Sequence, residues 1–421
     1  MPHVDASARN TFLADAASRL DQVVGNARAL IATPSPNPPL ATGAVAAVAA
    51  ALLREQVPEV DVTLFECGEG VVNLVARIKG AVPGRRLVLN GHLDTYPVNE
   101  ALPWTVDPFG GLVQNGRLYG RGAADMKGGI SASMTALAVL AKHRRLWRGE
   151  AVLVLAGDEE SMGQLGTQWL IDNVECAKGD AVIIGDAGSP SVVRFGEKGF
   201  LWIELEAVGK PAHGAHVHLG VNAIDRLRVA LDALAALRDL PVPAPDEVAR
   251  AIAAAKPFSE PLNGLGESET LMRVTVNIGH ITGGTSMNLV PAYARAGIDI
   301  RLPSGLLSSE IETRIDAALA GMAGVSWRIL RRYEASYTAP DASIVQTVAA
   351  AVEQVLGHYP AINMRVGGSD SRLYRLANIP TVVYGPTPFN MGGTDEYALV
   401  DELHTVAMVH ALAGLDFLSA D

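Results

Sequence analysis

Apolar and polar positions along the first half of the chain follow two rhythms, one typical of strands and one typical of helices. Short apolar runs rich in β-branched residues occupy 60–66, 72–78, 85–94, 151–160 and 180–186. Helical spacing covers 12–31, 42–56 and 128–142. Because apolar strands that alternate with helices need cover on both faces, we predict an α/β fold with a mixed, mostly parallel sheet and helices on both faces.

The rhythm changes after Gly199. Strand-like and helix-like segments then follow in the order β-α-β-β-α-β, at 199–210, 221–238, 272–284, 292–303, 308–322 and 325–336. This order is that of a ferredoxin-like α+β unit. We therefore predict that 196–337 is an inserted domain and that 1–195 and 338–421 together form the other domain, which ends in a helix from about 397 to 418.

Composition narrows the function classes. A chain of 421 residues with 49% hydrophobic residues is long enough for two packed domains. The net charge of -11 and the lack of a dense basic block argue against nucleic acid as a partner. Cys67 and Cys176 form no CxxC pair, and no segment has the pattern of a signal peptide or a membrane span, so we expect a cytoplasmic protein without a thiolate metal site.

Candidate metal ligands follow several of the predicted strands. They are His92 and Asp94 in GHLDTYP, Asp125 in GRGAADMKGG, Glu159 and Glu160 in GDEES, and Asp186 in GDAGSP. Singly, each fits an ordinary solvated loop. Because the carboxyl ends of parallel strands meet at one edge of a sheet, the set together indicates a shared site. Imidazole with carboxylates and no thiolate suits zinc, manganese or cobalt.

The ordered motifs GHLDTYP, GRGAADMKGG, GDEESMG, GKPAHGAHVHLGVNAI and GGTSMNLVP resemble those of the co-catalytic metallo-aminoacylases and exopeptidases. This family includes acetylornithine deacetylase, succinyl-diaminopimelate desuccinylase, aminoacylase and carboxypeptidase G. The resemblance covers nearly the whole chain. It implies that 196–337 is a lid domain through which the protein forms a homodimer.

The resemblance also implies a set of metal ligands. His92 and Asp186 would bind one ion, Glu160 would bind a second, and Asp125 would bridge the two. The peptide bond between Asp125 and Met126 would be cis.

Other residues take catalytic and binding roles by the same resemblance. Glu159 would be the general base for water activated by the metal, and Asp94 would hydrogen-bond the His92 imidazole. His213 would stabilise the tetrahedral oxyanion in a neighbouring subunit's site, and Asn288 would contact substrate. His216 and His218 read as part of a polar loop.

Two arginines are candidates to hold a substrate carboxylate, because a guanidinium can bind it with two parallel hydrogen bonds. They are Arg372 in GGSDSRLYR and Arg301 in DIRLP. A surface or structural ion pair is the alternative for each.

One position departs from the family pattern. Relatives usually supply the last metal ligand from a histidine four residues before a glutamate, and that position before Glu396 is Gly392. The centre could bind one ion firmly and leave the second position weak, empty or completed by water or substrate. Another side chain could fill the gap, the candidates being His404, His410, His216, His218 and Asp395. Alternatively, hydrolysis has been lost.

These observations predict a metal-dependent amidohydrolase that cleaves a C–N bond in a small anionic substrate such as an N-acyl amino acid or dipeptide, with one firmly bound ion. A hydrolase of an aryl amine or carbamoyl C–N bond is an alternative on the same scaffold. A non-catalytic small-molecule binding protein with a decayed metal site is the alternative from a different class.

Overall fold

The computed structural model describes residues 5–57, 59–68 and 70–420. The chain divides into two compact units. The first unit comprises Met1–Phe195, Thr338–Asn363 and Ser369–Asp421, and the second comprises Gly196–Tyr337 and Met364–Gly368. None of the described helices is long and apolar enough to cross a membrane.

The first unit is built on a mixed sheet with a parallel centre. Its strands run in the order β1 (Asp61–Gly68), β2 (Val71–Lys79), β6 (Glu150–Ala156), β3 (Arg86–His92), β7 (Ala181–Ile184), β17 (Thr381–Val383) and β8 (Val192–Glu197), and β16 (Ala361–Arg365) also pairs with β8. The four strands from β6 to β17 are parallel, and β1, β2 and β8 pair antiparallel with their neighbours. Register is set at the centre, where Val88 pairs with Val152 on one side and Val182 on the other.

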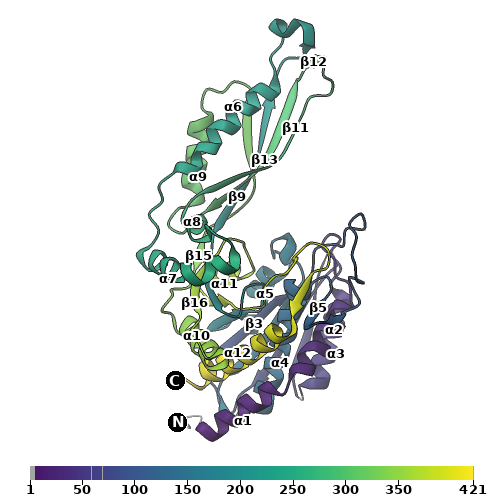
Figure 1. Cartoon of the computed structure of the whole chain (residues 1–421), viewed down its shortest axis with the longest axis vertical. Coiled ribbons are helices and arrows are strands. Elements are labelled where there is room, and N and C mark those ends of the chain that lie inside the picture. The colour runs from purple at the N-terminus through teal and green to yellow at the C-terminus, as the bar shows by residue number, and fades with distance from the viewer. Residues whose placement is uncertain (1–4, 58, 69, 421) are drawn as a thin grey trace. The chain divides into compact units, whose positions relative to one another are not determined.

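Helices cover this sheet because its central strands are apolar on both faces. Nearly every residue of β3 and β6 and every residue of β7 is buried, which requires cover on each side. The long helices α4 (Gly128–Lys142), α10 (Ser343–Leu356) and α12 (Val400–Ser419) pack side by side (Figure 1), next to α1 (Ala6–Ala17) and α2 (Leu20–Ile31). Helix α3 (Gly43–Gln56) contacts β1 and β2, while α5 (Thr167–Asn173) and α11 (Ser371–Leu376) contact each other. The predicted α/β fold with a parallel centre is confirmed.

Two predicted helix boundaries are wrong. The single helix expected over 12–31 is broken at Ser18, whose hydroxyl donates to the Asp15 carbonyl and competes with the helical backbone pattern. The final helix begins at Val400 rather than near 397, because Tyr397–Leu399 forms the short strand β18. That strand pairs with β5 (Arg117–Tyr119), which in turn pairs with β4 (Val113–Gln114). This pairing places Asp395 and Glu396, which precede β18, next to the segment that leads to Asp125.

The second unit has the predicted β-α-β-β-α-β order. Its four-stranded antiparallel sheet runs β11 (Thr275–Gly283), β13 (Tyr293–Leu302), β9 (Gly199–Val208) and β14 (Val325–Tyr333). Helices α6 (Ala223–Ala235) and α9 (Ser308–Leu319) contact each other and bury an apolar core against this sheet. The short strands β10 (Ala212–His213) and β12 (Leu289–Val290) pair with each other, and β15 (Ser336–Tyr337) pairs with the end of β8.

Helices α7 (Asp246–Asn263) and α8 (Glu267–Met272) lie between α6 and β11 in sequence and were not predicted. Pro257 and Pro261 stand inside α7, and proline is a signal against a helix interior. The helix nevertheless forms with Val248, Ile252 and Ala255 buried along one face. Burial of this face therefore outweighs the local preference.

His410 of α12 gives the first unit a stability that depends on pH. Its Nε2–H donates to the Tyr384 carbonyl at 2.8 Å and its Nδ1 accepts from the Ser133 hydroxyl at 3.1 Å, so the buried ring is neutral. Burial lowers the pKa of His410 to about 4. Because the unfolded chain binds this proton near pH 6.5 and the folded chain does not, this contribution is complete above pH 6.5 and is lost as the pH falls to about 4.

We expect His410→Gln to be less stable than the parent at pH 7 and to lose less stability on acidification. The free energy of unfolding from urea titrations should show the difference between the two proteins shrinking by about 3 kcal/mol from pH 7 to pH 4. A difference that stays constant over this range would mean that His410 is not held neutral.

Candidate metal centre

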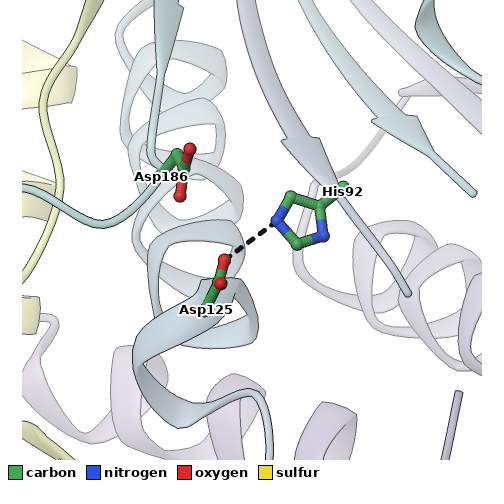
Figure 2. A group of neighbouring side chains, drawn as sticks. All are labelled: His92, Asp125 and Asp186. Atoms are coloured by element: carbon green, nitrogen blue, oxygen red, sulfur yellow. Dashed lines mark hydrogen bonds and ion pairs between the residues drawn. The ribbon is translucent and has the colours of Figure 1, made fainter. Parts of the chain in front are cut away.

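Three side chains that could hold a metal ion meet beyond the carboxyl ends of β3 and β7. His92 is the last residue of β3, Asp186 follows β7 by two residues, and Asp125 lies in the turn just before α4. Their ligand atoms all lie within 4.8 Å of one another (Figure 2), and among the described residues no other group of His, Cys, Asp and Glu side chains does so. The peptide bond after Asp125 is cis, as the resemblance implied.

Close backbone packing brings the Asp125 turn to Asp186. A Cβ atom added to Gly129, in the first turn of α4, would lie only 1.8 Å from the Gly185 carbonyl oxygen. Only glycine fits at such an approach. The glycines in KGGI and IIGD therefore set the spacing between two of the three candidate ligands.

The hydrogen bonds of His92 leave one ring nitrogen directed at a carboxylate. Nδ1 lies 2.9 Å from the Asp94 backbone carbonyl, which can only accept, so Nδ1 carries the proton. Nε2 then faces Asp125 Oδ1 at 3.0 Å, and two lone pairs at that distance need a positive charge between them. Burial lowers the pKa of His92, but the Asp125 and Asp94 carboxylates outweigh it and raise the pKa well above its ordinary value. A divalent cation fits the place of that extra proton.

Asp94 acts on the neighbouring acidic turn as well as on His92. Its buried carboxylate accepts from the backbone N–H groups of Glu159 and Glu160, both at 3.1 Å, and from Asn37 Nδ2 at 2.8 Å. The imidazole bond expected from Asp94 is therefore made by its backbone carbonyl, while the nearer carboxylate oxygen lies 3.5 Å from Nδ1. This arrangement fixes the acidic turn against the end of β3.

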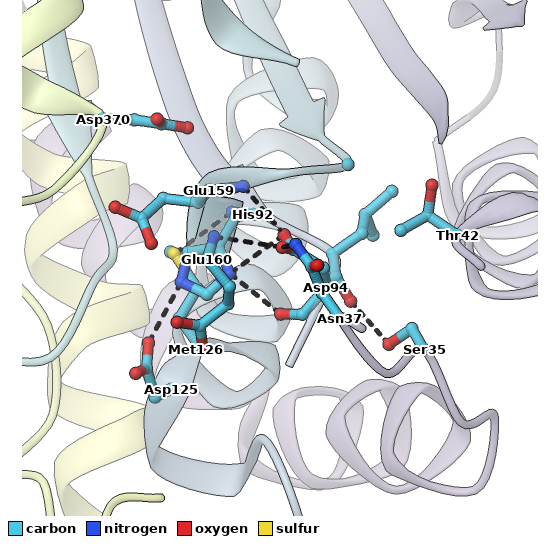
Figure 3. A network of polar contacts seen from close by, with 12 residues as sticks. Ser35, Asn37, Thr42, His92, Asp94, Asp125, Met126, Glu159, Glu160 and Asp370 are labelled. Carbon is cyan, nitrogen blue, oxygen red and sulfur yellow. Dashed lines mark hydrogen bonds and ion pairs between the residues drawn. The ribbon is translucent and has the colours of Figure 1, made fainter. Parts of the chain in front are cut away.

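Glu159 and Glu160 extend in different directions from that turn (Figure 3). Glu160 points toward Asp125, and its Oε1 is buried without a hydrogen-bond partner among the described residues. Glu159 points away toward the side where Asp370 lies. Its Oε1 is 3.4 Å from Nη1 of Arg372, a side chain that is only 2% exposed and also bonds the Ser369 carbonyl.

Burial and like charge disfavour ionisation of this cluster. Burial raises the pKa of Glu159 to about 8, and burial followed by repulsion from Asp125 raises the pKa of Glu160 to about 9. Burial also raises the pKa of Asp370. An excess of buried carboxylates around one imidazole is the environment that a bound divalent cation stabilises.

The loop that carries Gly392 is fixed by a buried ion pair. Arg121 Nη1 bonds Glu396 Oε2, and Arg121 Nη2 donates to the Gly392 and Gly393 carbonyls at 3.0 and 3.1 Å. Glu396 Oε1 accepts from the backbone N–H groups of Ala124 and Asp125. Glu396 therefore orients the turn that presents Asp125.

The side chains that could replace the histidine ligand missing at Gly392 differ in their contacts. Asp395 accepts from the backbone N–H and the hydroxyl of Thr105 at 2.8 and 2.9 Å. Both ring nitrogens of His410 are hydrogen-bonded, whereas His404 Nε2 is buried without a partner among the described residues. His216 and His218 belong to the second unit.

The remaining predicted residues also lie in the second unit. His213 is exposed and its Nδ1 accepts from Ala215 N at 3.1 Å. Asn288 is exposed and accepts from Ser286, and Arg301 pairs with Asp299 and lies over the Phe200 ring. All of these contacts are made within the second unit.

Sequence reasoning missed the residues that support the site. Asn37 and Ser35 bond Asp94 and the Leu93 carbonyl from a proline-rich loop, and Arg121 bonds Glu396. The sequence around them shows SPNPP and GRG, which signal turns rather than partners. Their roles come from contacts between segments far apart in the chain.

Comparison with known proteins agrees with this geometry. Residues 88–415 match peptidase family M20/M25/M40. This chain belongs to that family. The predicted family is confirmed, and with it the prediction of a metal-dependent hydrolase that acts on amide bonds.

Several M20 relatives are named succinyl-diaminopimelate desuccinylase. The one from Rhodospirillum centenum is 30% identical over 352 residues, which cover 81% of this chain and 83% of that protein. The one from Methylobacterium sp. (strain 4-46) is 32% identical over 354 residues, which cover 80% and 82%.

Solved M20 structures share the fold. An M20 family metallo-carboxypeptidase from Sulfolobus solfataricus superposes with a TM-score of 0.75 at 20% identity, covering 95% of this chain and 99% of that one. Human carnosine dipeptidase 1 gives a TM-score of 0.76 at 16% identity, covering 98% and 99%. This chain thus shares its fold with these two solved structures.

We expect a divalent cation to stabilise this M20 protein through His92, Asp125 and Asp186. Zinc added to metal-free protein at 100 times its dissociation constant should raise the free energy of unfolding by about 2.7 kcal/mol, which thermal melts will detect. Asp186→Asn should remove most of this gain, whereas the exposed Asp172→Asn should keep it. An equal gain in both variants would contradict the assignment of Asp186.

The Arg121–Glu396 pair gives a second expectation. Because both side chains are buried, Arg121→Met or Glu396→Met alone should cost about 3–5 kcal/mol of unfolding free energy by leaving one buried charge unpaired. The double variant should be more stable than the sum of the two losses predicts, which a double-mutant cycle by urea unfolding measures. Simple additivity would mean that the pair is not coupled.

Proposed function

We propose that this M20 protein hydrolyses the amide bond of a small anionic substrate, an N-acyl amino acid or a dipeptide. The observation that carries the proposal is the arrangement of one imidazole and two carboxylates, from His92, Asp125 and Asp186, beside the turn that holds Glu159. The relatives' names, a desuccinylase and a dipeptidase, both describe cleavage of such a bond.

His92, Asp125 and Asp186 would hold one divalent ion, zinc, manganese or cobalt. Imidazole and carboxylate ligands without thiolate suit these ions. A divalent ion held there would lower the pKa of a water molecule to about 7 and polarise the carbonyl group of the substrate. We propose one firmly bound ion because Gly392 has no side chain to offer as a ligand.

Glu159 would act as the general base and then as the general acid. Its side chain is largely buried, and its backbone is held by Asp94 so that the carboxylate is oriented before substrate binds. It would take a proton from the attacking water and deliver it to the leaving nitrogen. Burial raises the pKa of Glu159, which favours a carboxylate able to accept and return a proton near neutral pH.

Arg372 is proposed to hold a substrate carboxylate, since its guanidinium can bind one with two parallel hydrogen bonds and lies 3.4 Å from the carboxyl group of Glu159, the proposed general base. Arg301 and Asn288 are proposed as further substrate contacts, and His213 as the donor that stabilises the oxyanion. These three belong to the second unit, for which we propose a lid role and homodimer formation. Two free cysteines are in keeping with a cytoplasmic setting.

The test is hydrolysis of a panel of N-acyl amino acids and dipeptides in the presence of zinc, manganese or cobalt. Glu159→Gln should lower kcat by several orders of magnitude while the protein still binds zinc, because the amide cannot take up the proton. Glu353→Gln, an exposed change on α10, should leave kcat unchanged. No activity of the parent on any substrate of the panel, or full activity of Glu159→Gln, would refute the proposal.

A further inference from the structure

The loop at 33–38, which follows α2, is hydrogen-bonded to two of the segments that form the site. The Ser35 hydroxyl donates to the Leu93 carbonyl at 2.6 Å, just beyond the end of β3. Lys127 Nζ, from the turn that leads into α4, donates to the Thr33 carbonyl at 2.8 Å. The loop therefore links two segments that are far apart in the sequence and that present candidate ligands.

Two backbone hydrogen bonds fix the end of β3 against this loop. Thr95 N donates to the Ser35 carbonyl and Asn37 N donates to the Thr95 carbonyl, both at 2.9 Å. Directly before Thr95 is Asp94, whose backbone carbonyl accepts from His92 Nδ1. The His92 ring is therefore held by contacts that do not involve the Asn37 side chain.

The Asn37 side chain acts on a different part of the site. Asn37 is only 7% exposed and lies beside Asp94 (Figure 3). Its Nδ2 donates to Asp94 Oδ2 at 2.8 Å and to the Ser161 hydroxyl oxygen. Because a carboxylate only accepts, the Asn37 atom that faces it must be the amide nitrogen. That nitrogen carries two hydrogens, and each has an acceptor here.

Asn37, Asp94 and the acidic turn form a closed set of hydrogen bonds. The Asp94 carboxylate accepts from the Glu159 and Glu160 N–H groups, and Ser161 is the last residue of the same turn. Asn37 thus bonds the turn at Ser161 and also bonds the carboxylate that holds the turn at its other end. Both contacts fix the backbone from which the Glu159 side chain extends.

We propose that Asn37 is a positioning residue for the general base. Its two hydrogen bonds set the orientation of the turn that carries Glu159, while the His92 ring is held without them. Asn37 lies outside residues 88–415, so the match to the M20 family gives it no role. The inference rests on the proposed function, in which Glu159 is the base, and adds the residue that orients it.

The first test is hydrogen exchange of the Glu159 and Glu160 amides, measured by mass spectrometry of peptides spanning 157–163 from the metal-free full-length protein. In Asn37→Ala these amides should exchange at least about tenfold faster than in the parent, since a hydrogen bond to a charged group is lost. Asn173→Ala, a change at an exposed asparagine of α5, should match the parent. Equal rates in Asn37→Ala and the parent would overturn the proposal.

Asn37→Asp separates hydrogen-bond donation from packing. It keeps the shape of the side chain, but its carboxylate cannot donate and is repelled by Asp94, so exchange should be at least as fast as in Asn37→Ala. Exchange at the parent rate would mean that the side chain only fills space, and the proposal would be wrong. If the Asn37 variants do not fold, Ser161→Ala replaces them. It removes one acceptor and should speed exchange by a smaller factor, and an unchanged rate would count against the role of Asn37.

The second test compares hydrolysis with zinc binding. Asn37→Ala should lower kcat by about 10–100-fold and change the zinc dissociation constant far less, because the His92 ring keeps its contacts. A loss of zinc affinity as large as the loss of kcat would show a general structural role and overturn the proposal. A parent without activity would refute the proposed reaction, and faster exchange in Asn37→Ala would still establish that Asn37 orients the turn.

Discussion

The concentration of carboxylates beyond the carboxyl ends of the parallel central strands is the constraint on which the site depends. Asp94, Asp125, Glu159, Glu160 and Asp186 lie around a single imidazole with little access to water. Charges of one sign in such a place destabilise the fold unless hydrogen bonds and positive charge compensate them. The surrounding contacts supply both, and His92 Nε2 and Asp125 Oδ1, which are 3.0 Å apart, are placed to share a cation.

Backbone N–H groups rather than side chains donate most of the hydrogen bonds that compensate these carboxylates. Asp94 accepts from the Glu159 and Glu160 N–H groups, and Glu396 accepts from those of Ala124 and Asp125. Each bond fixes a turn, and each turn presents a functional carboxylate. The buried carboxylates of Asp94 and Glu396 thus orient the turns that carry Glu159, Glu160 and Asp125, which links the stability of the loops to the geometry of the site.

Much of the fold and of the candidate site could be predicted from the sequence, because strand periodicity shows where each strand ends and parallel strands bring those ends together. The family motifs then suggested roles for His92, Asp125 and Asp186. The break at Ser18 and helix α7 with its two prolines could not be predicted, since tertiary packing decides them against local preference. The hydrogen bonds that the Asp94 carboxylate accepts could not be predicted for the same reason.

The central claim is that one cation lies between His92, Asp125 and Asp186. Anomalous diffraction at the zinc edge, from crystals of the full-length protein grown with zinc, tests it most directly. One strong anomalous peak is expected in the first unit, within bonding distance of one ligand atom from each of the three side chains. Two peaks bridged by Asp125, with the second bound to Glu160, would contradict it.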